Sequence, residues 1–176
     1  MRFKLNLLTL AMLTFAAGSA QANILTFSGD STGASTFNRP VEDLSALSLV
    51  GTATPYSAYA FTVSTAGTYS FVSTARFDNF VLLYEGAFTS ASPLQSALTA
   101  NDDLVTSDTS GFGAELSAGT SYVLVTTGYD NDAYGAFTNT IGGPGLIAAV
   151  PEVDSYLLML SGLLAVAGIA GRRKVR

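Results

Sequence analysis

Three short clusters of aspartate and asparagine contain the side chains of this sequence best suited to chemistry. They are Asp78-Asn79, Asn101-Asp102-Asp103 and Asp130-Asn131-Asp132. Oxygen ligands in loops are what Ca²⁺ takes in proteins, usually about six to eight at once. A calcium site predicted from these clusters uses the carboxylates Asp78, Asp102, Asp103, Asp130 and Asp132. The competing interpretation is that Asp and Asn are turn residues that bond to their own backbone.

Other site chemistries are limited by the absence of cysteine and histidine from the sequence. This absence excludes Cys/His zinc sites and serine nucleophiles activated by histidine, including one at Ser31 in the elbow-like stretch 29–33. A serine–lysine dyad is not expected, because Lys4 and Lys174 lie near the two ends. Glycoside hydrolysis needs only two carboxylates, but nothing else indicates a cleft. We therefore expect a protein that is not an enzyme.

The central part of the chain, residues 23–150, is acidic. Its 128 residues contain two cations, Arg39 and Arg76, against eleven Asp and Glu, which gives a net charge of −9. Such a field repels nucleic acid and anionic polymers, so no nucleic-acid partner is expected. The length suffices for one domain with a hydrophobic core, which must be stable without disulfides.

The central part has the pattern of an all-β protein. Short β-branched and aromatic runs alternate with Gly, Ser, Asn, Asp and Pro, without a long 3.6-residue period. Strands are predicted at 24–28, 36–38, 58–64, 68–74, 80–84, 112–116, 121–127 and 135–141. The run 80–84 is apolar on both faces, which is typical of a central strand. Residues 90–101 are predicted to be a loop with a helical turn at 93–98, and residues 142–149 a Gly/Pro linker after the domain 23–141.

Two segments of the central part repeat at an offset of 52 residues. Ala66-Gly67-Thr68 recurs as Ala118-Gly119-Thr120, and Phe77-Asp78-Asn79 recurs as Tyr129-Asp130-Asn131. If the two copies are stacked hairpins, both Asp-Asn loops lie on one rim. The alternative is a chance similarity between two hairpins that use the same turn residues.

Residues 1–22 have the three parts of a secretory signal peptide. Arg2 and Lys4 form the charged region, the apolar region runs from Leu5 to Ala17, and Ala20 and Ala22 form a small-x-small cleavage site. We expect cleavage after Ala22, with Gly18-Ser19-Ala20 as a second site, and an exported protein.

The C-terminal tail, 150–176, combines an apolar run with a basic end. Residues 155–171 carry no charge and span about 25 Å as a helix, which just suffices for a single transmembrane helix. Four Lys/Arg follow in residues 172–176, and the positive-inside rule keeps them cytoplasmic. The central part of the chain, residues 23–150, which we call the body, then lies on the non-cytoplasmic side of the membrane. A core helix and a plain tail anchor are the alternatives.

The order of these features resembles the PEP-CTERM sorting signal of Gram-negative bacteria. The matching residues are Val150, Pro151 and Glu152 before the apolar run and Arg172, Arg173 and Lys174 after it. The resemblance implies recognition and cleavage by an exosortase-type membrane enzyme. It also implies transient anchoring in the inner membrane with the body in the periplasm, followed by delivery to the cell surface or outside the cell.

Segments of the body also resemble PEP-CTERM ectodomains and, more loosely, the bacterial pre-peptidase C-terminal domain. These segments are 37–40, 59–69, 77–84, 101–103, 116–122 and 128–131. The second resemblance implies a jelly-roll-like β-sandwich that tolerates calcium and has a non-catalytic binding or targeting role. We therefore expect a structural or adhesive protein of the surface or extracellular matrix. The alternative is an exopolysaccharide-binding module that stacks Tyr and Phe rings on sugars.

Overall fold

The computed structural model describes residues 22–150, which form ten β-strands and no helix. The strands are β1 (Asn23–Asp30), β2 (Thr36–Phe37), β3 (Thr54–Val63), β4 (Gly67–Ala75), β5 (Asn79–Glu85), β6 (Ala97–Asn101), β7 (Thr109–Leu116), β8 (Ser121–Gly128), β9 (Ala136–Gly143) and β10 (Ile147–Ala149). No helix in this part is long and apolar enough to cross a membrane. The predicted transmembrane run and most of the predicted signal peptide lie outside the described residues.

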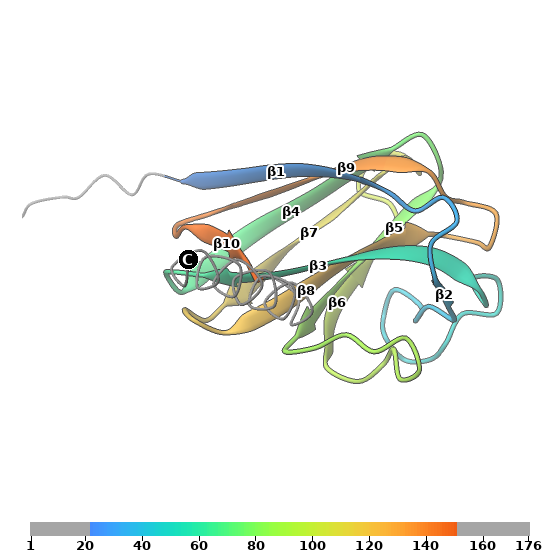
Figure 1. Cartoon of the computed structure of the whole chain (residues 1–176), viewed down its shortest axis with the longest axis horizontal. Helices are drawn as coiled ribbons and strands as arrows, with labels where there is room; N and C mark the ends of the chain where they lie inside the picture. The colour runs from blue at the N-terminus through green and yellow to red at the C-terminus, as the bar shows by residue number, and fades with distance from the viewer. Residues whose placement is uncertain (1–21, 151–176) are drawn as a thin grey trace, which may run out of the picture.

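The strands form two antiparallel sheets that face each other (Figure 1). One sheet has four strands in the order β1-β9-β4-β7. The other has the order β10-β3-β8-β5-β6, with β2 also paired to β3. The predicted all-β, sandwich-like architecture is thus confirmed for the described residues.

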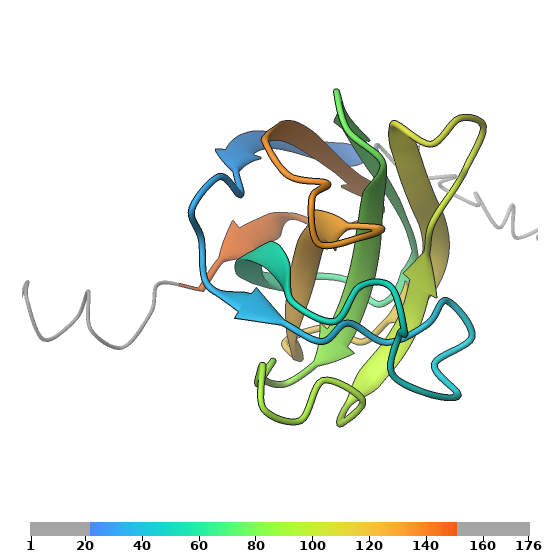
Figure 2. The ribbon, with the colours of Figure 1, turned by 90° about the vertical axis from the view of Figure 1, so that its right-hand side faces the viewer.

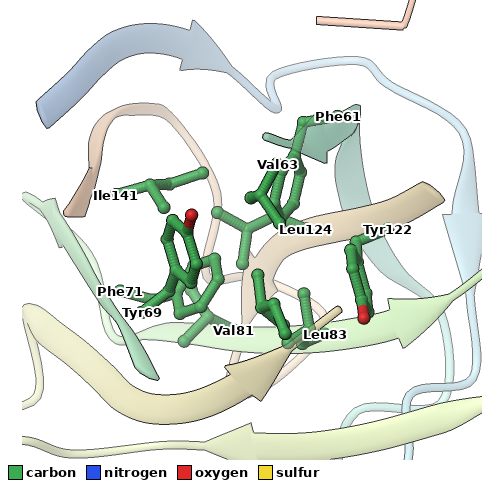
Figure 3. Close-up of a cluster of buried hydrophobic side chains, with 10 residues drawn as sticks. Phe61, Val63, Tyr69, Phe71, Val81, Leu83, Tyr122, Leu124 and Ile141 are labelled. Carbon is green, nitrogen blue, oxygen red and sulfur yellow. The ribbon is translucent and has the colours of Figure 1, made fainter. Parts of the chain in front are cut away.

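The space between the sheets is filled by the alternate side chains that each strand directs inward. Figure 3 shows this cluster, in which Phe61, Tyr69, Phe71 and Leu124 meet from β3, β4 and β8. The other buried members are Val63, Val81, Leu83, Leu116, Tyr122 and Ile141. The rings of Phe27 in β1 and Tyr59 in β3 stack with centroids 3.9 Å apart and link the two sheets.

A second apolar cluster covers part of the outer face of the larger sheet. Phe80, Leu82 and Tyr84 of β5 point to this face, and Phe37 of β2 and Phe88 of the β5–β6 loop pack on them. Because both of its faces are covered, β5 is buried along almost its whole length. It lies between β8 and β6, so the prediction that 80–84 is an interior strand is correct.

The repeated segments meet, although they are not hairpins. Each Ala-Gly-Thr segment joins strands of opposite sheets, β3 to β4 and β7 to β8, and the Gly119 amide donates to the Val63 carbonyl at 2.9 Å. At the opposite end, the Tyr129 amide donates to the Asp78 carbonyl at 2.9 Å. The two Asp-Asn loops therefore share one rim, as the repeat predicts.

Residues 142–149 belong to the sandwich rather than to a linker. Strand β9 extends through Gly143, and β10 pairs with β3. A Cβ at Gly143 would lie 2.1 Å from the Tyr69 ring, and the Gly145 amide donates to the Tyr69 hydroxyl at 2.9 Å. These glycines allow close packing on a tyrosine, and the domain extends further than the predicted 23–141.

The predicted loop at 90–101 also contains a strand. Residues 97–101 form β6, which pairs with β5, and 93–98 form no helical turn. The Tyr84 hydroxyl donates to the Pro93 carbonyl at 2.9 Å, which fixes the chain in an irregular turn before β6 begins.

Candidate metal centre

Three inter-strand loops converge on the rim that faces the viewer in Figure 2. They connect β4 to β5, β6 to β7 and β8 to β9. Besides the bond between Tyr129 and Asp78, two further backbone hydrogen bonds join the loops, both at 2.9 Å. The backbone N–H of Asn79 donates to the Ser107 carbonyl, and the backbone N–H of Ala75 donates to the Asp108 carbonyl. These bonds fix the loops relative to one another.

The rim brings together Asp78, Asp102 and Asp103. Each contributes a carboxylate oxygen, and these oxygens all lie within 4.8 Å of one another. Two oxygens bound to one Ca²⁺ at about 2.3–2.6 Å can be no more than about 5 Å apart, so the separation fits a shared ion. Oδ1 of Asp78 and Oδ1 of Asp102 are buried and have no hydrogen-bond partner in the described part of the chain. Buried carboxylate oxygens without a partner are costly, and a cation or a proton would stabilise them.

The electrostatics of the cluster agree with this geometry. Burial raises the pKa of Asp102 to about 6, and the charges of Asp103 and Asp78 add to the increase. Burial also raises the pKa of Asp78, followed by the charges of Asp103 and Asp130. At neutral pH the rim therefore holds carboxylates that repel one another and are partly shielded from water.

Two of the five predicted ligands are not part of this group. Asp130 and Asp132 are exposed, and Oδ1 of Asp130 accepts the Asp132 amide at 2.9 Å. This local hydrogen bond gives Asp130 the role of a turn residue, which is the interpretation that competes with metal binding. Asp130 still acts on Asp78 through its charge.

Arg39 is the buried cation next to these aspartates, and the sequence did not predict its role. The side chain is only 2% exposed, and its guanidinium carbon lies 4.1 Å from the centroid of Phe80 and 4.8 Å from that of Tyr129. Its nitrogens donate to backbone carbonyls, Nε and Nη2 to Tyr129 at 2.9 and 2.7 Å and Nη1 to Pro40 at 2.9 Å. Arg39 thus opposes the raised pKa values of the aspartates without occupying their oxygens.

A buried polar group beneath the cluster positions Asp102. The Ser110 hydroxyl lies 2.7 Å from the Asn79 carbonyl oxygen and also contacts the Asp102 carbonyl. The side-chain nitrogen Nδ2 of Asn79 donates to the Ser73 hydroxyl at 2.9 Å. The side chains of Ser73, Asn79 and Ser110 are all buried. The only sequence signal for this group was inward-facing polar residues in otherwise apolar strands.

The arrangement supplies hard oxygen donors for a divalent cation. Asp78, Asp102 and Asp103 would hold Ca²⁺, with water or carbonyl oxygens completing its coordination. Bound calcium would link the β4–β5 loop, which contains Asp78, to the β6–β7 loop, which contains Asp102 and Asp103. A recess of about 520 Å³ beside the cluster is lined by Asp102, Glu42 and Arg39, but not by Asp78 or Asp103. Of the three carboxylates, only Asp102 lines this recess.

The predicted sorting and cleavage residues fall mostly outside the described part of the chain. These are Ala20, Pro151, Glu152, Arg172, Arg173 and Lys174. Ala22 is exposed and directly precedes β1. Val150 is exposed, and its amide donates to the Ala60 carbonyl at 2.9 Å.

No protein-family model and no curated protein matches the sequence. Solved structures with a similar fold include the pre-peptidase C-terminal domain of a collagenase from Bacillus anthracis, with 14% identity, 66% of this chain and 87% of that chain covered, and a TM-score of 0.41. A periplasmic inhibitor of g-type lysozyme from Aeromonas hydrophila has 11% identity, coverage of 78% and 93%, and a TM-score of 0.38. A family 35 carbohydrate-binding module from an environmental isolate has 12% identity, coverage of 70% and 97%, and a TM-score of 0.38. At these values the similarity carries no conclusion about function.

Without divalent ions, the melting temperature is expected to rise as the pH falls from about 7 to about 5. Burial raises the pKa of Asp102 to about 6 in the folded chain, from an ordinary value of 3.8, so the folded state binds a proton in this window that the unfolded state does not. The gain is on the order of 1 kcal/mol, because solvent still screens this half-buried group. Circular dichroism melts in EDTA measure it, and Asp102→Asn should remove most of the slope. A wild-type melting temperature that falls with pH would contradict this assignment.

Proposed function

We propose that this protein is an exported structural or adhesive module of the cell surface or extracellular matrix, with a rim fixed by calcium and no catalytic activity. Its architecture would be a jelly-roll-like sandwich between a signal peptide and a PEP-CTERM-like tail with one transmembrane helix. The observation that carries the proposal is the acidic rim, where two buried carboxylate oxygens of Asp78 and Asp102 have no protein partner in the described chain. Calcium is abundant outside cells, so such a rim suits an exported protein.

Two further observations support this proposal. The sandwich begins at Asn23, directly after the predicted cleavage site, and β10 ends at Ala149, directly before the predicted sorting tail. The folded unit therefore fills the interval between the two predicted sorting segments. An exosortase-type enzyme would process the tail in the inner membrane, after which the body would leave the periplasm for the surface or the medium.

Intact-mass analysis of the full-length protein tests export and processing. The protein would be produced in a host with the sorting enzyme and recovered separately from membranes and from the extracellular fraction. We expect an extracellular form that begins near Asn23 and ends near Pro151 or Glu152. A chain that keeps residues 1–22 and remains in the cytoplasm would contradict export, and a membrane form that retains Arg176 would contradict processing.

Carbohydrate binding is a second candidate, supported by two aromatic side chains on the rim. Tyr129 and Tyr134 are 38% and 45% exposed, and both follow β8 in the loop toward β9. Exposed tyrosine rings can stack on sugars, so Tyr129 and Tyr134 would be the residues that contact an exopolysaccharide. The other aromatic side chains of the described chain are buried or half-buried, so the rim does not present a broad aromatic platform.

A further inference from the structure

The outer face of the four-stranded sheet presents an ordered array of hydroxyl side chains. The strand register places Ser28, Thr138, Thr74 and Thr109 side by side, one from each of β1, β9, β4 and β7. The next row holds Thr26, Thr140, Val72 and Gly111, and a third holds Ile24, Gly142, Ser70 and Gly113. Neighbouring strands lie about 4.8 Å apart, and successive rows on one face about 6.7 Å apart. Seven of these twelve positions carry a hydroxyl, including all four of the first row, and the other five are Ile24, Val72 and three glycines.

Four of the seven hydroxyl residues are exposed, and Thr109, Thr138 and Thr140 are half-buried. The exposed four are Thr26, Ser28, Ser70 and Thr74. Where they bond to each other, as Thr26 to Thr140 at 3.2 Å and Ser28 to Thr138 at 3.0 Å, each hydroxyl still has lone pairs to offer, because it can donate one hydrogen bond and accept two. Ligand hydroxyls could therefore join the array without breaking it.

A recess marks the first row as a place where a ligand could sit. It has a volume of about 340 Å³. Three of the four hydroxyl residues of the row line it, together with Arg76. At the same end of the sheet, Asp30 is the last residue of β1 and Asp108 directly precedes β7. These two acids offset the single cation, so the recess does not favour an anion.

The charge of the body determines which ligand suits this face. The rows themselves carry no charged side chain, and Glu115 lies beyond the third row, opposite Thr68. An anionic polymer would be repelled by the net charge of −9 on residues 23–150. A second copy stacked on the face would bring two such bodies to within about 10 Å, close to the screening length at physiological salt. A neutral partner rich in hydroxyls meets neither penalty.

We propose that the outer face of the β1-β9-β4-β7 sheet binds a neutral polysaccharide. The sugar hydroxyls would exchange hydrogen bonds with Ser28, Thr138 and Thr74, and the chain would cross the rows toward Gly113. This inference rests on the carbohydrate-binding candidate for the ligand class, but it assigns the sugar to this face instead of to Tyr129 and Tyr134, and Tyr134→Ala distinguishes the two sites.

Gly113 offers a way to block the face without disturbing the core. A Cβ at Gly113 would meet nothing closer than 3.9 Å, and its φ is not positive, so a side chain there points into open space. Gly113→Tyr should therefore cover the third row, while Gly113→Ala serves as its matched control. The double variant Thr74→Val, Thr138→Val removes two hydroxyls of the first row and keeps the β-branched shape.

The test measures binding of the purified full-length protein, in a non-glycosidic detergent, to cellulose, chitin and dextran, with alginate as the anionic control. We expect binding to at least one neutral polysaccharide. The double Thr→Val variant should weaken it by about tenfold or more, as expected for two lost hydrogen bonds, and Gly113→Tyr should weaken it by at least as much because its ring covers the third row. Gly113→Ala, Tyr134→Ala and Thr62→Val, which lies on the other sheet, should bind like wild type. Melting curves of every variant verify folding.

Several results would overturn the proposal. They are no binding to any neutral polysaccharide, stronger binding to alginate, wild-type binding by folded Gly113→Tyr, or loss of binding in Tyr134→Ala alone. Self-association that Gly113→Tyr abolishes would assign the face to a second copy instead. Hydrolysis of the bound polysaccharide that Asp102→Asn abolishes would indicate an enzyme. Because purified protein is used, a failure here is distinct from a failure of export.

Discussion

Replacing Arg39 by alanine is expected to lower the free energy of unfolding by about 3–5 kcal/mol. The guanidinium group lies between the rings of Phe80 and Tyr129 and donates to the carbonyls of Tyr129 and Pro40. Alanine would leave a hollow between the rings and remove the donors from both carbonyls. It would also remove the positive charge that lowers the pKa of Asp78 and Asp102.

Arg76 provides the matched control for this substitution. It is the other cation of the body and is exposed, so Arg76→Ala should change stability by no more than about 0.5 kcal/mol. Arg39→Met fills part of the hollow without the charge and should give an intermediate loss. Thermal unfolding of the full-length variants followed by circular dichroism measures all three. Equal stability of Arg39→Ala and Arg76→Ala would show that Arg39 does not support the rim.

The fold class was predictable because strands leave a period of two in the sequence. The run 58–64 places Tyr59, Phe61 and Val63 on one face, and the structure turns Phe61 and Val63 into the core between the sheets. The uniformly apolar run 80–84 identified the strand with both faces covered. These signals are local, so a single sequence is sufficient to detect them.

The linker prediction failed because glycine has two uses. Gly-Gly-Pro-Gly at 142–145 has the composition of a flexible connection, yet Gly143 is required where the Tyr69 ring packs against the backbone. Which use applies depends on a tyrosine more than 70 residues earlier in the sequence. Strand β6 was missed for a related reason, since its pairing with β5 rather than its own composition makes it a strand.

The candidate metal centre was predictable in part. The Asp-Asn repeat indicated the shared rim, but the composition of the Asp and Asn clusters could not separate Asp102, whose Oδ1 is buried, from Asp130, whose Oδ1 accepts a local amide. The role of Arg39 depends on rings and carbonyls from distant segments. The hydroxyl array was not predicted at all, because it appears only once the register of four strands is known.

Calcium is expected to stabilise the folded chain at neutral pH. Extracellular modules hold Ca²⁺ with dissociation constants of about 10⁻⁴–10⁻³ M, so about 5 mM Ca²⁺ would add about 1–2 kcal/mol. For a domain of this size that corresponds to a rise in melting temperature of about 5 °C. The physical reason is that the ion replaces repulsion among Asp78, Asp102 and Asp103 by attraction and satisfies two buried oxygens.

Asp102→Ala and Asp132→Ala form the matched pair for this effect. Asp102 lies in the group of three and Asp132 is an exposed turn residue outside it, so only Asp102→Ala should abolish the response to calcium. In EDTA, Asp102→Ala also relieves the repulsion, which limits the stability that the variant loses. The response to calcium is therefore a cleaner readout than the melting temperature itself.

The most direct measurement is the melting temperature of the full-length protein in EDTA and in about 5 mM Ca²⁺, for wild type, Asp102→Ala and Asp132→Ala. A rim fixed by calcium predicts a rise of several degrees in wild type and Asp132→Ala and none in Asp102→Ala. An unchanged wild-type midpoint, or a response that survives in Asp102→Ala, would contradict the metal centre and leave the aspartates as turn residues.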